Sequence, residues 1–156
     1  KQVKNKVMKI ENQVVTIEQA KKLKELGVTA EPLFWYVIDI DPITPLDIIQ
    51  KWQHSNFDQC EKYPAYTVAE LGVMLPHFDN LSQMGGFVHL TEFDPSVQDG
   101  NPWYCVWEYD KDKENAGFGS EIIDGETEAQ ARAAMLIYLL ENNLTTAEEV
   151  NQRLNS

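Results

Sequence analysis

Four segments of the chain carry apolar residues at helical spacing, and each follows a Thr-x-x-Glu/Gln tetrapeptide. The tetrapeptides begin at Thr16, Thr67, Thr127 and Thr146. In a capping box the threonine hydroxyl accepts the backbone N–H three residues later, and the Glu or Gln side chain accepts the threonine N–H. The sequence therefore predicts four helices that begin directly after these threonines. A repeated modification site would not account for the apolar spacing that follows each one.

The same spacing indicates where the helices end and how deeply they lie. Gly27 is placed to end the first helix in a left-handed cap, and Pro76 stops the second. The helix over 128–142 is apolar almost all round, which is typical of a helix packed on more than one side. A looser start, with Thr44 as cap and Pro45 in the first helical position, predicts a fifth helix.

Aromatic and β-branched residues concentrate in runs between the helices, which predicts strands. The runs are 33–39, 87–93, 103–109 and a weaker one over 118–124. The three later runs can pair as an antiparallel meander, with the 128–142 helix laid across one face. We expect an α+β, two-layer domain with a mainly antiparallel sheet of three or four strands, this long helix in the C-terminal half, and additional short helices. The irregular surfaces should lie near 54–63 and 94–101.

The length of 156 residues and the 43% hydrophobic fraction suit one domain with its own core. We expect a flexible basic tail over 1–13 and a single globular domain over 14–156. Cys60 and Cys105 fit no zinc or redox spacing, so reduced thiols and a cytoplasmic location are expected. No apolar run approaches the roughly 20 residues that a membrane span needs.

The distribution of charge narrows the classes of partner. The net charge is −12, and four of the 13 basic residues lie in the first nine positions. The rest of the chain is therefore still more acidic. Such a body repels phosphate backbones, so direct nucleic-acid binding is not expected, whereas basic protein surfaces are favoured.

No catalytic constellation stands out. The sequence contains no Walker A, G-x-G-x-x-G or G-x-S-x-G motif, and His54, His77 and His89 are scattered without a partner one helical turn away. Cys60 could act as a nucleophile beside a histidine, but no signature supports this. We therefore predict no catalytic residue and no cofactor.

Two acidic patterns have the form of cation sites. Asp110, Asp112, Glu114 and Glu121 fall at positions 1, 3, 5 and 12 of an EF-hand-like loop. Position 6, which should be glycine, is Asn115, and the flanks are predicted strands, so a charged hairpin is the favoured interpretation.

The second pattern is a D-x-D pair formed by Asp39 and Asp41 at a predicted strand end. Pro42 follows directly, which favours a structural turn.

Aromatic and acidic side chains provide a candidate binding surface. The four tryptophans, Trp35, Trp52, Trp103 and Trp107, could line a ligand groove but are more economically core residues. A speculative surface nevertheless combines two tryptophans with the acidic loop: Trp52, Trp103, Asp110, Asp112 and Glu114.

Three segments carry a family resemblance: "VVTIEQAKKLKELGV" (14–28), "YPAYTVAELGVMLP" (63–76) and "GETEAQARAAMLIYLLENN" (125–143). Together they resemble small uncharacterised proteins encoded by phages, prophages and other mobile elements of gut bacteria. Departures are Tyr66, where that family tends to have proline, the segment 77–101, and the helix after Thr146. The strand-then-helix end is also similar to that of HicB-type antitoxins. The resemblance implies a provenance and transfers no catalytic residue.

Three hypotheses for function follow. The first is a non-enzymatic accessory protein of a phage or mobile element that binds another protein, in the host cytoplasm or in the virion. The second is an acidic inhibitor that mimics DNA and occupies a host nuclease or defence complex. The third is a metal-dependent enzyme or calcium-loop protein that uses Asp39 and Asp41 or the 110–121 loop.

Overall fold

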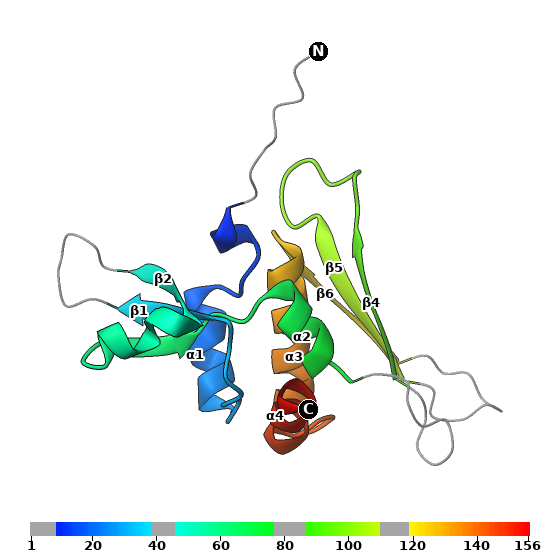
Figure 1. Cartoon of the computed structure of the whole chain (residues 1–156). Coiled ribbons are helices and arrows are strands. Elements are labelled where there is room, and N and C mark those ends of the chain that lie inside the picture. Colours follow the sequence, from blue (N-terminus) through cyan, green and yellow to red (C-terminus); the bar gives the residue numbers. More distant parts are fainter. Residues whose placement is uncertain (1–8, 39–45, 77–86, 110–118) are drawn as a thin grey trace.

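In the part of the chain that the structure describes, four α-helices lie between two small antiparallel sheets (Figure 1). The computed structural model describes residues 9–38, 46–76, 87–109 and 119–156, of which 52, 54, 55, 87–90, 107–109 and 119–121 are described by their backbone alone. The elements in chain order are η1 (Ile10–Asn12), α1 (Ile17–Glu25), β1 (Phe34–Ile38), β2 (Asp47–Gln50), η2 (Lys51–Phe57), β3 (Glu61–Pro64), α2 (Val68–Met74), β4 (Phe87–Phe93), β5 (Trp103–Tyr109), β6 (Gly119–Gly125), α3 (Glu128–Glu141) and α4 (Ala147–Asn155).

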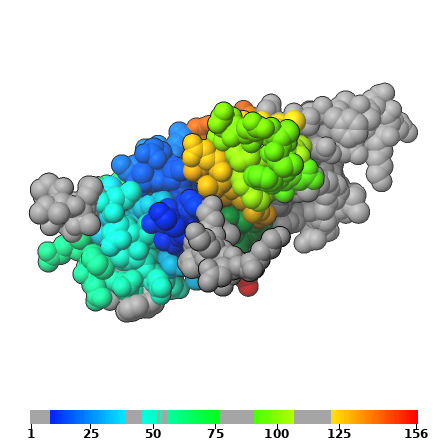
Figure 2. Space-filling model, turned by 90° about the horizontal axis from the view of Figure 1, so that it is seen from above, coloured from blue at the N-terminus to red at the C-terminus, as the bar shows by residue number. Residues whose placement is uncertain are grey.

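The first sheet has the strand order β2-β1-β3, and the second sheet has the order β4-β5-β6. In the first sheet Tyr36 lies opposite both Ile48 and Tyr63. In the second, Cys105 lies opposite both Thr91 and Ile123. Helix α1 packs on β3, and α3 packs on β5 and β6, so the two sheets cover opposite sides of the helical layer. Figure 2 shows the cyan residues of the first sheet well apart from the green residues of β4 and β5.

The predicted α+β class and the long helix across an antiparallel meander are confirmed. The first predicted strand forms, as β1, but it pairs with two short strands that the sequence analysis did not predict. One of them, β3, overlaps the end of the 54–63 stretch that was expected to be irregular. At the N-terminus, η1 lies within the segment expected as a tail, and Ile10 packs against the core.

The predicted fifth helix is wrong. Residues Asp47–Gln50 form β2, although Thr44 and Pro45 themselves lie outside the described residues. A short capped helix is marginal by itself because its nucleation costs more than its few hydrogen bonds return. Pairing along β1 instead places Ile48 beside Tyr36 and buries Ile49, and β-branched residues suit such a pleated surface.

The four predicted caps form. In α1, α2 and α4 both halves of the capping box are present. At α3 the Thr127 hydroxyl accepts the N–H of Gln130, but the Gln130 side chain accepts instead from the N–H of Glu126, at 3.1 Å. At α2 the capping Glu70 does more than close the box, because its second oxygen accepts the Leu33 N–H at 2.8 Å. This cap therefore also fixes the chain that leads into β1.

Two buried tyrosines join the first sheet to the loops around it. The Tyr36 hydroxyl donates to the carbonyl of Val15, and the Tyr66 hydroxyl donates to the carbonyl of Ala30, both at 2.6 Å. Burial raises the pKa of Tyr36 to about 12 and raises that of Tyr66 further. Both groups therefore remain neutral hydrogen-bond donors at physiological pH.

An arginine from α3 lies across the backbone of α2. Arg132 donates from Nη1 to the carbonyl of Val68, at 3.1 Å, and from Nη2 to Glu128, at 2.7 Å. A Cβ at Gly72 would come within 2.4 Å of Nη1. A side chain at position 72 would therefore displace the guanidinium from this place.

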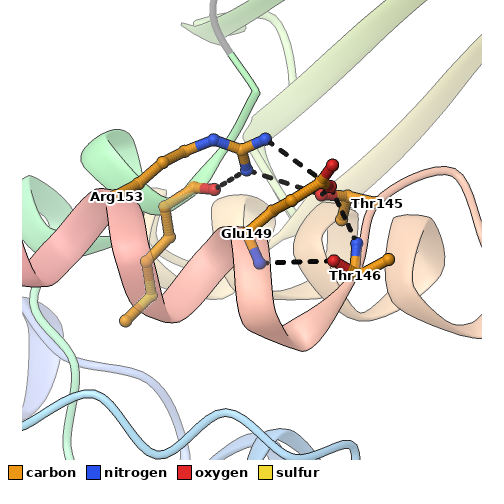
Figure 3. A network of polar contacts seen from close by, with 5 residues as sticks. Thr145, Thr146, Glu149 and Arg153 are labelled. Atoms are coloured by element: carbon orange, nitrogen blue, oxygen red, sulfur yellow. Dashed lines mark hydrogen bonds and ion pairs between the residues drawn. The ribbon is translucent and has the colours of Figure 1, made fainter.

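A second arginine holds the other end of α2 (Figure 3). Arg153 of α4 donates from Nη1 to the carbonyl of Met74, the last residue of α2, at 2.9 Å. Beside it Glu149 accepts the Thr146 N–H at 3.1 Å and the Thr145 hydroxyl at 3.0 Å. Charged donors suit the carbonyl end of a helix, so α4 caps α2 from outside.

The contact between Arg132 and Gly72 predicts a reversal of sign. In the wild-type background Gly72→Ala displaces the guanidinium and should lower the free energy of unfolding by about 1–2 kcal/mol. In an Arg132→Ala background the same change should raise it by about 0.5–1 kcal/mol, because alanine is the better helix former. Urea unfolding of the four proteins gives the coupling. Equal effects of Gly72→Ala in both backgrounds would contradict the contact.

The network around Glu149 predicts a dependence of stability on pH. The N–H of Thr146, together with the two threonine hydroxyls and Arg153, holds the pKa of Glu149 below its ordinary value. A lowered pKa contributes stability above the unfolded-state value that is lost as the pH falls through the folded-state value. The free energy of unfolding should therefore fall less in Glu149→Gln than in wild type between about pH 5.5 and 3.

The matched control is Glu148→Gln. It removes the same charge from the same turn of α4 without touching the hydrogen bonds of Thr145 and Thr146. Its unfolding curve should follow the wild-type pH dependence. If Glu149→Gln also follows that dependence, the carboxylate is not linked to folding.

Candidate functional site

A pocket of about 430 Å³ opens beside β3, at the edge of the first sheet. It lies between the end of α1, the loop that follows it, β1 and β3. Its lining residues are Lys24, Val28, Thr29, Ala30, Trp35, Cys60, Glu61, Lys62, Pro64 and Tyr66. A volume of this size falls within the range typical of small-molecule sites.

The floor of the pocket is apolar and fixed. Val28, Ala30, Pro64 and Tyr66 are buried, and Trp35 is half-buried. The hydrogen bond from the Tyr66 hydroxyl to the Ala30 carbonyl ties two parts of this floor together. The surface is therefore preformed and does not depend on a ligand to bring it together.

The rim carries charge. Lys24 Nζ lies 4.7 Å from the centre of the Tyr63 ring and donates to the carbonyl of Lys62 at 3.2 Å. Lys62 Nζ lies 3.5 Å from Asp58, and Glu61 accepts the Tyr63 hydroxyl. Among the residues that the structure describes, no carboxylate lies within ion-pair distance of Lys24. Lys24 is thus a cation held by an aromatic ring and a carbonyl.

The loop that forms one wall is anchored from α4. Asn151 Oδ1 accepts the N–H groups of Thr29 and Ala30 at 2.8 and 3.0 Å, and its amide nitrogen donates to the Gly27 carbonyl and the Thr29 hydroxyl. Gly27 has a positive φ of 89°, which favours glycine at the turn that starts this loop. The pocket therefore depends on residues from both ends of the chain.

A second feature is the open face of the second sheet, which we define by Glu92, Tyr104, Val106, Ile122 and Asp124. Register places Tyr104 between Glu92 and Asp124, and Val106 beside Ile122. The opposite face carries Cys105 and Ile123, which belong to or pack against the core under α3. Of the open face, Ile122 is 64% exposed, and no described helix packs over it.

Polar contacts organise the carboxylates of the open face. The Tyr104 hydroxyl donates to Glu92, which raises the pKa of Tyr104. Asn101 donates to Asp124 at 3.1 Å. The face thus presents an apolar pair, Val106 and Ile122, next to two oriented acidic groups.

The residues predicted from sequence are only partly placed. Trp103 is half-buried at the start of β5, where its ring centre lies 5.3 Å from that of Phe93. Trp52 lies in η2 and Glu121 lies in β6, but their side chains are outside the described part of the chain. Asp39, Asp41, Asp110, Asp112 and Glu114 all lie outside the described residues. Within the described ranges, no group of three metal-ligating side chains occurs.

Sequence reasoning missed the pocket and most of the open face. Lys24, Trp35 and Tyr66 belong to three separate segments, and no spacing along the chain brings them together. The open face had a usable signal, since the alternation over 103–109 already separated Tyr104 and Val106 from Cys105. Ile122 follows from the register of β6 against β5.

Comparison with protein-family models, curated proteins and solved structures gave no match. None of the helices that the structure describes combines the length and the apolar character that crossing a bilayer requires.

Cys60 and Cys105 should differ in their reactivity toward thiol reagents. Cys60 is half-exposed at the pocket, whereas Cys105 is fully buried, and this burial raises the pKa of its thiol. A thiol reagent should therefore modify Cys60 in the native protein. Cys105 should react at least about 100-fold more slowly, because it becomes accessible only when the fold opens. Mass spectrometry of the modified peptides identifies the site. Modification of both at similar rates without denaturant would contradict the burial of Cys105.

Proposed function

We propose that this chain is a non-enzymatic accessory protein of phage or mobile-element origin that acts in the host cytoplasm by binding a basic partner protein. The open face of the second sheet is the proposed docking surface. The observation that carries the proposal is the exposed Ile122, paired with the half-buried Val106 beside two carboxylates. The resemblance of three segments to mobile-element proteins supports the provenance.

The apolar pair favours a protein partner. A side chain as exposed as Ile122 contributes little to the stability of the domain itself, and burying it against a partner would contribute about 1.5–3 kcal/mol. Tyr104 adds a side chain of a type enriched in protein interfaces. An antiparallel sheet commonly packs one face on its core and leaves the other available, so the fold presents this surface without rearrangement.

The charges favour a basic partner. Glu92 and Asp124 flank Tyr104 on the open face, and the whole chain carries a net charge of −12. Complementary charge accelerates encounter and excludes other acidic surfaces. The proposed partner therefore carries lysine or arginine around an apolar centre.

The DNA-mimic alternative makes a different prediction for the same face. A mimic would bind through its carboxylates, so affinity should fall steeply with salt and depend little on Ile122. In the proposed mode, the apolar pair carries much of the affinity, and salt mainly slows association.

Substitution of Ile122 tests the docking surface. Ile122→Lys removes the apolar contact and places a positive charge against a basic partner, so binding should fall at least tenfold, equivalent to about 1.4 kcal/mol. Immobilised wild-type and variant proteins are compared in quantitative affinity capture from host cells. The supporting result is a basic protein depleted by Ile122→Lys and then bound directly, in purified form, by wild type.

Leu33→Lys is the matched control. Leu33 is 55% exposed, comparable to Ile122, and lies before β1 rather than on the open face. The partner should be retained by this variant. The proposal fails if both variants retain the same proteins, or if the captured partner is displaced by duplex DNA and is indifferent to Ile122→Lys.

A further inference from the structure

We propose that the pocket beside β3 binds a small anion with a flat apolar body, of the aryl carboxylate or aryl sulfonate class. This site is separate from the open face, and its evidence is independent of the proposed protein partner. The size of the pocket, the side chains of its floor and the contacts of Lys24 support this assignment.

The floor of the pocket favours a ligand with an apolar body. The partly exposed Trp35 lies beside a space of about 430 Å³, and the buried residues Val28, Ala30, Pro64 and Tyr66 form the apolar wall behind it. Sites for small organic ligands combine such walls with a few polar groups that fix orientation. A flat ligand can lie against the Trp35 ring, where stacked and edge-to-face arrangements are favourable.

Lys24 gives the rim a cation that can contact an anionic ligand. Lys62 is paired with Asp58, and the Glu61 carboxylate accepts the Tyr63 hydroxyl. Within the described part of the chain, Lys24 contacts a carbonyl and an aromatic ring and no carboxylate. Its ammonium can therefore turn to a ligand carboxylate without breaking an ion pair among the described residues, and the new hydrogen bond is charge-assisted at both ends.

The hydrogen bond from Lys24 to the Lys62 carbonyl also protects the edge of the first sheet. The carbonyl of Lys62 belongs to the outer strand of the first sheet, and a lysine at such an edge discourages pairing with another chain. The same residue thus protects the strand when the pocket is empty and supplies a cation when a ligand enters. Lys21, whose Nζ lies 5.4 Å from the Tyr63 ring centre, adds to the positive potential nearby.

The probe for this site is 1-anilinonaphthalene-8-sulfonate, and its uncharged relative N-phenyl-1-naphthylamine isolates the contribution of the anion. Fluorescence titration of wild type should show one saturable site for the sulfonate. Lys24→Gln should weaken sulfonate binding about fivefold or more and leave the uncharged probe within twofold, because only the first contains the charge that Lys24 contacts.

Lys22→Gln is the control for charge. Lys22 lies on the same helix and is paired with Glu141 instead of facing the pocket. It removes one positive charge from α1 and should leave both probes within twofold of wild type. Equal sulfonate affinities in wild type and Lys24→Gln would overturn the proposed role of the cation.

Protection of Cys60 places the probe in the pocket. Saturating sulfonate should slow alkylation of Cys60 at least fivefold, and the buried Cys105 serves as an internal reference. Cys60→Trp, which fills the pocket, should abolish binding of both probes while circular dichroism shows an unchanged fold. If Cys60 reacts at the same rate with and without probe, the pocket is not the site.

Ile122→Lys separates this proposal from the protein partner. It should leave probe binding unchanged, because Ile122 belongs to the second sheet. Loss of probe binding in Ile122→Lys with full binding in Lys24→Gln would move the probe to the open face and overturn the pocket proposal. The outcome of the partner capture does not bear on this result.

Discussion

The packing of α2 depends on the guanidinium of Arg132, which lies in the space that Gly72 leaves open. Helix α2 has only seven residues and would not be stable alone. Arg132 holds its first turn through the carbonyl of Val68, and Arg153 holds its last through the carbonyl of Met74. Because position 72 has no Cβ, the guanidinium of Arg132 has room to lie against α2 and make the first of these contacts. Both helices of the C-terminal part are thereby fixed to one short helix in the middle of the chain.

This arrangement determines which surfaces remain for function. The helices fill the space between the sheets, so each sheet uses one face for the core. In the second sheet the other face is left with Val106 and Ile122. In the first sheet the space beside β3 is bordered by Lys24 and by the loop that Asn151 anchors. Both candidate sites are therefore consequences of how the helical layer is packed, on opposite sides of it.

The sequence was most informative where the determining interactions are local. Each threonine box spans four residues, so Thr16, Thr67, Thr127 and Thr146 could be identified as caps without any tertiary information. The long helix 128–142 and the meander strands were predictable for the same reason, since their length or alternation is distinctive. The second hydrogen bond of the Thr127 capping box could not be predicted in this way, because the Gln130 side chain accepts from the N–H of Glu126 instead.

Non-local pairing explains what sequence reasoning could not supply. Strands β2 and β3 have four residues each, too few for a periodic signal, and exist because β1 lies between them. Pairing with β1 likewise makes β2 a strand, where the sequence predicted a helix after Thr44. The pocket could not be predicted from the sequence, because Lys24, Trp35 and Tyr66 come together only in the tertiary structure. Its apolar residues look like core residues in sequence, and its cation looks like a surface lysine.

Two of the segments quoted for the resemblance contain the residues that join α2 to α3. In "TVAELG", Thr67 caps α2, the carbonyl of Val68 accepts from Arg132, and Gly72 makes room for its guanidinium. In "TEAQAR", Glu128 orients that same arginine. These two motifs therefore account for the packing of α2 against α3. In our proposals, binding depends on other residues, namely Lys24 at the pocket and Ile122 on the open face.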